Sequence, residues 1–312
     1  MNSFLIAVDA VLPFLIYISF GYGVRRAGVA DEAFMYRLNS LIFRAFFPIM
    51  MFYNLYSVEH GLSLDPKMVG LSAASILLLE LLLVLIVPRL VAENPKRGVI
   101  IQAMYRSNFV LFGIPLATSI FGSGGTTLAT MMIAIVIPIY NVTAVIILEM
   151  YRGGKISPGV LAKNVIHNPM IRGAVVGFVF FILNIKLPAS VEEPIAQLAA
   201  LSTPMALFVL GGTLHFSAIR HNLRYLVPAI SIKLLVLPAI ALAAATALGL
   251  GSVERFVYFE MFATPVAAAS YSMAQNMGGD GELAGQLVVI STAVSVFTIF
   301  LWVFFLSGTG LI

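Results

Sequence analysis

The chain has 312 residues and a formal net charge of +4, with 60% hydrophobic and only 10% charged residues. Its mean hydropathy is +1.01. A soluble domain carries about 25% charged residues, so this composition excludes a soluble globule and indicates a polytopic membrane protein. Cysteine is absent, which excludes disulfides and thiolate metal sites.

Ten apolar segments are each long enough to cross a bilayer as a helix of about 20 residues. In chain order we predict these spans at Leu5–Val24, Leu38–Tyr56, Met68–Leu90, Val99–Phe121, Leu128–Tyr151, Asn168–Ile185, Ile195–Phe216, Tyr225–Leu248, Glu254–Met277 and Leu283–Phe305. The start, Met1–Leu12, lacks a basic region and carries Asp9. We therefore expect the first span to be retained rather than removed as a signal peptide.

Basic residues are distributed unequally between the two sides of these spans. One side holds Arg25, Arg26, Arg37, Arg89, Lys96, Arg97, Arg152, Lys155, Lys163, Arg172, Arg220 and Arg224, and the other only Lys67, Lys186 and Arg255. Because cytoplasmic loops collect Lys and Arg, we predict that both termini face outside. This asymmetry accounts for the net charge without a nucleic-acid partner, and we expect the basic loops to meet the headgroups of membrane lipids.

Prolines recur at nearly constant spacing in the two halves of the chain. Pairs 156 residues apart are Pro13 with Pro169, Pro48 with Pro204, and Gly21 with Gly177; pairs 150 apart are Pro88 with Pro238 and Pro115 with Pro265. Each half holds five spans, an odd number, so the second half must enter the bilayer from the opposite face. We therefore predict an all-α fold of two inverted five-helix repeats, residues 1–155 and 156–312. The alternative is that the prolines only kink helices for packing.

The fourth and ninth spans each contain a predicted helix break. The first is at Gly113-Ile114-Pro115 and the second at Thr264-Pro265-Val266, where small residues follow. A break at membrane depth frees backbone groups, which then need a partner such as a ligand. Where two broken helices cross, the N-terminal ends of the half-helices favour an anion. We therefore predict that helices 4 and 9 cross and that a substrate binds between them.

The same segments resemble the auxin efflux carrier family. Arg106-Ser107-Asn108 with Gly113-Ile114-Pro115-Leu116 is similar to the family's fourth-helix motif, an Asn followed by Gly-Ile-Pro or Gly-Val-Pro. Further similar motifs are Asn168-Pro169 at the start of the second half, Pro204–Leu207 with Gly211–Leu214 in helix 7, and Pro265–Asp280 in helix 9. The long cytosolic loop of plant members is missing. The chain therefore resembles the short prokaryotic members described as malonate or malate permeases.

This resemblance implies a two-domain carrier of the bile acid symporter type in a bacterial inner membrane. Helices 1, 2, 6 and 7 would form a scaffold, and helices 3–5 and 8–10 a transport domain that moves by an elevator-type alternating access. The family's crossover site carries over to Asn108, Pro115 and Pro265. We predict that Asn108 contacts the substrate, because a neutral amide donates to a carboxylate without the cost of a buried cation. The alternative for Asn108 is an amide that bridges two helices.

Among the ionisable residues within the spans, where charges are costly and are read as functional by default, four are candidates for a functional role. Glu80 and Lys233 occupy corresponding helices and form either a structural ion pair or part of the transport mechanism. Arg106 binds a substrate carboxylate through its planar guanidinium, or it reaches the cytoplasmic interface. Glu260, five residues before Pro265, takes a proton or a cation, or it faces water near the outer entrance.

The sequence thus predicts a secondary transporter for small organic anions, either carboxylates such as malonate and malate or auxin-like weak acids. A sodium- or proton-coupled symporter of the bile acid type and a non-transporting receptor are the alternatives. The four histidines lack metal-ligand spacing, and no nucleotide motif or catalytic dyad is found. We therefore expect no enzyme activity, no metal and no cofactor. The oligomeric state stays open, with a homodimer as one candidate.

Overall fold

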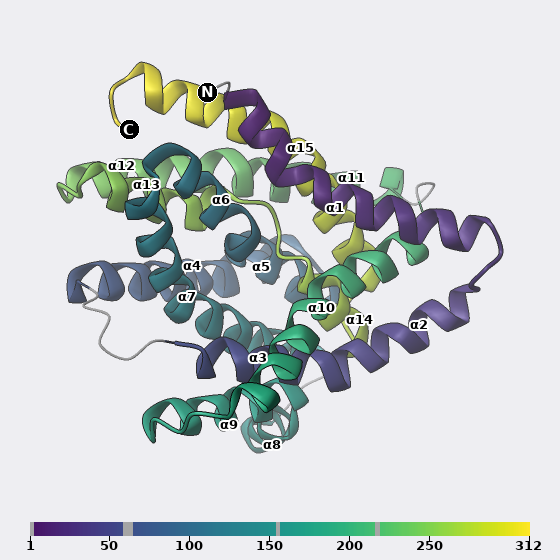
Figure 1. Cartoon of the computed structure of the whole chain (residues 1–312). Helices are drawn as coiled ribbons and strands as arrows, with labels where there is room; N and C mark the ends of the chain where they lie inside the picture. Colours follow the sequence, from purple (N-terminus) through teal and green to yellow (C-terminus); the bar gives the residue numbers. More distant parts are fainter. Residues whose placement is uncertain (1–2, 59–64, 154–156, 216–218) are drawn as a thin grey trace.

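A computed structural model describes residues 3–58, 65–153, 157–215 and 219–312, which are almost entirely helical (Figure 1). In chain order the helices are α1 Ser3–Arg26, α2 Glu32–Leu41, α3 Phe47–Tyr56, α4 Pro66–Leu90, α5 Asn94–Tyr105, α6 Phe109–Phe121, α7 Ser123–Met150, α8 Pro158–His167, α9 Pro169–Ile182, α10 Ala189–Thr213, α11 Ile219–Ser231, α12 Leu237–Ala247, α13 Ser252–Ala263, α14 Ala269–Asn276 and α15 Gly281–Gly308. Single π-helical turns, Ile42–Phe46 and Ile232–Val236, join α2 to α3 and α11 to α12.

Six continuous helices of the described chain are long and apolar enough to cross a membrane, so the protein is a polytopic membrane protein. They are Glu32–Tyr56, Pro66–Leu90, Ser123–Met150, Ala189–Thr213, Ile219–Ala247 and Gly281–Gly308. The pair α8 and α9, bent by 65°, makes a seventh if it is counted as one span. These helices coincide with predicted spans 2, 3, 5, 7, 8 and 10, and α9 with span 6. Each of the predicted spans 4 and 9 is instead two short helices, α5 with α6 and α13 with α14.

The predicted position of the break in span 4 is wrong. Gly113-Ile114-Pro115 lies inside α6, and the chain leaves the helical conformation earlier, at residues 106–108. At Gly113 a Cβ would lie 2.7 Å from the ring of Phe109, which is fully buried. The missing side chain of Gly113 therefore makes room for this ring rather than ending the helix. The break in span 9 does fall at Thr264-Pro265, because the residue before a proline avoids the helical conformation.

Two close helix crossings hold the first, second, sixth and seventh predicted spans together. Helix α1 packs against α10 and α3 packs against α9. Gly21 of α1 lies so close to Phe208 that a Cβ would overlap with the carbonyl oxygen, and a Cβ at Gly177 of α9 would lie 2.5 Å from the carbonyl oxygen of Phe52. Gly177 and Phe208 are each 156 residues beyond Gly21 and Phe52. Each crossing therefore joins the first half of the chain to the second, and the same spacing of 156 residues relates the two contacts.

Candidate functional site

Two extended segments cross between the short helices. Residues 106–108 connect α5 to α6, residues 264–268 connect α13 to α14, and Ser107 and Val266 form an antiparallel β-bridge. The backbone N–H of Asn108 donates to the carbonyl oxygen of Pro265 at 2.8 Å, and the N–H of Ala267 donates to the carbonyl oxygen of Arg106 at 3.3 Å. These bonds satisfy backbone groups that the helix breaks free, so the crossing is held by the two segments themselves.

A cavity of about 510 Å³ lies beside this crossing. This volume is within the usual range for small-molecule sites, roughly 300 to 1,000 Å³. The crossing, α6 and α7 form one wall, while α1, α3 and α10 form the other. Polar side chains along the lining are Asp9, Tyr17, Tyr53, Asn54, Arg106, Ser107, Asn108, Tyr140, Asn141 and Thr203. The rest of the lining is apolar, so the cavity suits a ligand with few charged groups.

Arg106 brings a buried positive charge to this cavity. The residue is only 3% exposed, so its guanidinium does not extend to the membrane interface. One terminal nitrogen donates to Met273 Sδ at 2.9 Å and to Ser270 Oγ at 3.4 Å, and the other donates to Asn141 Oδ1. In the described residues no carboxylate lies within ion-pairing distance of Arg106. A buried cation with neutral partners alone is incompletely compensated, and an anion in the cavity would complete its environment.

Asn108 adds a hydrogen-bond donor without a partner. Its side-chain nitrogen Nδ2 is buried and makes no hydrogen bond within the described parts of the chain. The residue stands directly before α6 but does not cap that helix through its side chain. The nitrogen therefore does not bridge two helices. Because a buried unpaired donor is costly, a ligand acceptor in the adjoining cavity would relieve a penalty of about 1–3 kcal/mol.

The other predicted contact residues divide into two groups. Pro115 lines the cavity, whereas Gly113, Ile114 and Thr264-Pro265-Val266 do not belong to its lining. Pro265 and Val266 instead take part in the backbone pairing of the crossing, and the Val266 N–H donates to Ser291 Oγ of α15 at 3.1 Å. The second crossing segment contributes residues 267 and 268 to the lining, and residue 269 at the start of α14 continues it. This run of three alanines was a sequence signal for close approach of a ligand or backbone.

The opposite wall was not predicted. Phe14, Tyr17, Tyr53 and Leu207 come from α1, α3 and α10 and face the crossing across the cavity. They read as ordinary apolar or interfacial residues of membrane helices, because nothing local marks which face of a helix will meet a distant segment. Tyr140 of α7 was also missed; it lines the cavity and its hydroxyl donates to the carbonyl oxygen of Met261 at 3.0 Å.

The predicted ion pair between Glu80 and Lys233 is wrong. Lys233 is fully buried in the π-helical turn of helix 219–247, and its Nζ donates to Ser107 Oγ at the crossing. No ion pair joins Lys233 to Glu80 in the described residues, and Glu80 Oε2 is buried without a hydrogen bond. The interpretation of Glu260 as a water-facing residue is also wrong. Glu260 is 1% exposed, and neither of its carboxylate oxygens has a hydrogen-bond partner among the described residues.

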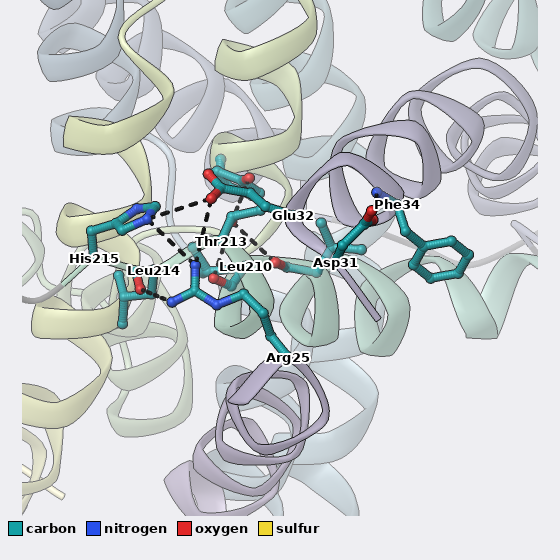
Figure 2. Close-up of polar contacts among 10 residues, drawn as sticks. Arg25, Asp31, Glu32, Phe34, Leu210, Thr213, Leu214 and His215 are labelled. Carbon is teal, nitrogen blue, oxygen red and sulfur yellow. Dashed lines mark hydrogen bonds and ion pairs between the residues drawn. The ribbon is translucent and has the colours of Figure 1, made fainter. Parts of the chain in front are cut away.

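A polar cluster joins the far ends of the cavity-lining helices α1 and α10 (Figure 2). Arg25 at the end of α1 donates to the carbonyl oxygen of Leu214 at 3.3 Å, and its other terminal nitrogen lies 3.4 Å from His215 Nε2. Glu32 at the start of α2 lies 3.7 Å from His215 and 4.0 Å from Arg25. The cavity is lined by residues 9–17 of α1 and 196–207 of α10, so the cluster closes the opposite ends of the same helices.

Two further bonds connect α10 and α2 to α14. The hydroxyls of Thr213 on α10 and Tyr271 on α14 lie 2.6 Å apart, and Ser40 Oγ of α2 donates to Asn276 Oδ1 at 3.0 Å. Helix α14 directly follows the second crossing segment. Any sliding of the crossing along α1 and α10 must therefore break these two contacts.

Comparison with known families places the geometry in context. A family model described as a membrane transport protein matches residues 6–303. The matched range contains both crossing segments, every residue that lines the cavity, and the polar cluster at the far ends of α1 and α10. A search of curated proteins finds no match.

Proposed function

The chain belongs to the auxin efflux carrier family of membrane transport proteins, and from this premise we propose that it is a secondary transporter for small organic anions. Carboxylates such as malonate and malate, or auxin-like weak acids, are the substrate classes that we propose. One observation carries the proposal: Arg106 and Asn108 both line the cavity beside the crossing, and among the described residues the Arg106 guanidinium has no carboxylate partner and Asn108 Nδ2 makes no hydrogen bond. Membership of a transporter family argues against an enzyme.

The positive character of the crossing supports an anionic substrate. Arg106 lies in the first crossing segment, and Lys233 donates to Ser107 of the same segment from behind the cavity wall. Helix α6 begins directly after this segment, so the positive end of its dipole also lies at the crossing. A carboxylate in the cavity would meet the guanidinium, the amide of Asn108 and this helix end. The apolar lining would surround the remainder of the substrate.

We further propose that the chain forms ten spans in two inverted repeats, residues 1–155 and 156–312. The equivalent crossings of Gly21 with Phe208 and of Gly177 with Phe52 support this arrangement, as do the two interrupted spans. Helices α1, α2–α3, α9 and α10 would form the scaffold, and α4–α7 with α11–α15 the transport domain. Inverted halves can exchange conformations, which gives a carrier two states of similar energy.

In this arrangement the substrate alternates between the two faces as the transport domain slides along the scaffold. If the protein lies in a bacterial inner membrane with its basic loops on the cytoplasmic side, both termini and the cavity face outside. The cluster of Arg25, Glu32 and His215 then lies at the cytoplasmic end. The bonds from Thr213 to Tyr271 and from Ser40 to Asn276 would hold the outward-facing state closed on that side.

A cation-coupled symporter is the second candidate. The observation that favours it is Glu260 near the end of α13, whose two carboxylate oxygens are buried and have no hydrogen-bond partner in the described part of the chain. A proton or a sodium ion would neutralise such a carboxylate, and helix C-terminal ends favour cations. Glu80, with one unpaired buried oxygen, and Lys233 are the other proposed coupling residues.

Uptake into proteoliposomes tests both candidates. Labelled malonate, malate and indole-3-acetate would each be offered with a sodium gradient, with a proton gradient, and with neither. Flux of one of these anions without any gradient supports uniport, and flux that needs a gradient identifies the coupling ion. Binding of an anion to the purified protein with no flux under any condition would instead make the protein a receptor. Absence of both binding and flux would refute the anion assignment.

A further inference from the structure

A second hollow lies on helices α4, α5 and α11, away from the crossing. It is an apolar groove of about 400 Å³. Helix α5 packs against both α4 and α11 and forms the floor with Ile100 and Met104. Leu90 of α4 and Pro228 and Ala229 of α11 belong to the walls. Leu90 is 77% exposed in the isolated chain, so this groove opens toward whatever surrounds the protein.

Charged residues gather at one end of the groove. The Tyr225 ring lies under two cations, with Arg224 Cζ 4.6 Å and Lys96 Nζ 5.2 Å from its centroid. Glu93 is the carboxylate that pairs with both: it forms an ion pair with Lys96, and it lies 3.9 Å from Arg224. Two positive charges therefore share one carboxylate, and Arg97, which donates to a backbone carbonyl of the lining at 2.7 Å, adds a further one, so this end of the groove is positive overall. The Arg224 side chain is 69% exposed, so it is free to turn toward a ligand.

We propose that this groove binds an anionic phospholipid, with one acyl chain over Ile100 and Met104 and the phosphodiester at Arg224. The net positive charge complements the negative charge of a phosphodiester. A zwitterionic lipid would bring a further cation to a place that already holds Arg224 and Lys96. Tyr225 between the apolar groove and the basic end also fits the membrane interface, where tyrosines are enriched. The site is separate from the cavity at the crossing and does not depend on what is transported.

Other occupants fit less well. A transmembrane helix is about 10 Å across and about 30 Å long, so its volume is several times the 400 Å³ of the groove and most of it would lie outside. A second copy of the chain related by two-fold symmetry would bring its own excess positive charge against the first, which is unfavourable. A free phosphate would use the charged end and leave the apolar groove unfilled.

Thermal unfolding of the purified full chain in detergent tests the proposal. Phosphatidylglycerol, phosphatidylcholine with the same acyl chains, and glycerol phosphate without chains would be titrated separately. We expect phosphatidylglycerol to raise the midpoint in a saturable manner and the other two to have little effect. Arg224→Gln should weaken the apparent affinity for phosphatidylglycerol by about 10- to 100-fold, because it removes a hydrogen bond to a charged group. Arg220→Gln is the matched control, since Arg220 is exposed on the same helix but does not line the groove.

A second variant tests the apolar part of the site. Ala229→Leu narrows the groove without changing charge, so we expect it to lower the affinity for phosphatidylglycerol while Arg224 stays in place. If Arg224→Gln does not fold, the affinity of Ala229→Leu tests the proposal instead. Equal stabilisation by phosphatidylglycerol and phosphatidylcholine would overturn the proposal, as would equal stabilisation by glycerol phosphate. A dimer in light scattering that Ala229→Leu disrupts would assign the groove to a second copy and would also overturn it.

Discussion

Asn108→Ala separates substrate binding from folding. The Asn108 Nδ2 atom has no protein partner among the described residues, and the side chain does not cap α6, so the substitution removes no internal hydrogen bond of that nitrogen. The bond from the Asn108 backbone N–H to Pro265 survives, since alanine keeps the N–H. We therefore expect normal insertion and a thermal midpoint close to that of the unaltered protein.

The loss in binding follows from one hydrogen bond to a charged ligand. Such a bond is worth about 1.5–3 kcal/mol, so Asn108→Ala should weaken anion binding roughly 10- to 150-fold. Isothermal titration with the transported anion gives the affinity, and proteoliposome uptake gives the flux. Asn54→Ala is the matched control, because Asn54 lines the same cavity from α3 on the opposite wall. We expect it to change affinity less than about threefold, within the effect of one weak contact.

Two results would refute this reasoning. Wild-type affinity and flux in Asn108→Ala would mean that the amide does not touch the substrate. An equal loss in Asn54→Ala would mean that the cavity as a whole, rather than the crossing, recognises the anion. Pro115→Ala complements the test, because Pro115 lines the cavity from within α6 and its replacement restores one helical N–H there.

The remaining predictions concern stability and topology. Lys233→Met should lower flux at a nearly unchanged thermal midpoint, because replacing a buried charge with an apolar side chain of similar shape often leaves stability unchanged. A thermal midpoint that falls in proportion to the flux would contradict this. Gly177→Ala should destabilise by about 1–3 kcal/mol through overpacking, whereas Gly23→Ala, with open space around it, should be tolerated on thermal unfolding. A cysteine introduced at Ser123 should be labelled from outside, and one at Ser157 only after permeabilisation. The reverse pattern would overturn the proposed orientation.

Hydropathy and helix breakers are local properties of the sequence, so the membrane spans and one helix break could be predicted from them. Six of the predicted spans coincide with long apolar helices, because about 20 apolar residues have no stable alternative in a bilayer. The break at Thr264-Pro265 was also predicted, since proline constrains its own residue and the one before. The spacing of Gly21 and Gly177 in the sequence indicated that they are equivalent, but it did not indicate which helices they contact.

Features that depend on distant segments could not be predicted in this way. The break in span 4 lies at residues 106–108 and not at Gly113-Ile114-Pro115, because hydrogen bonds to residues 265–267 replace the lost helical ones. Lys233 was paired with Glu80 by depth alone, yet the rotation of its helix directs Nζ to Ser107. Depth along a span follows from sequence position, whereas direction around the helix axis depends on its neighbours.

Local patterns in the sequence thus predict a helical membrane protein with two interrupted spans and a repeated arrangement of prolines and glycines. The packing of distant helices sets where the chain crosses itself, which wall faces Arg106 and Asn108, and which buried charges lack a partner among the described residues. The reason is physical. Hydrophobic burial and backbone constraint act residue by residue, but a site is made by contacts between segments that lie far apart in the sequence, as with Asp9 and Ala269, which are 260 residues apart in one lining.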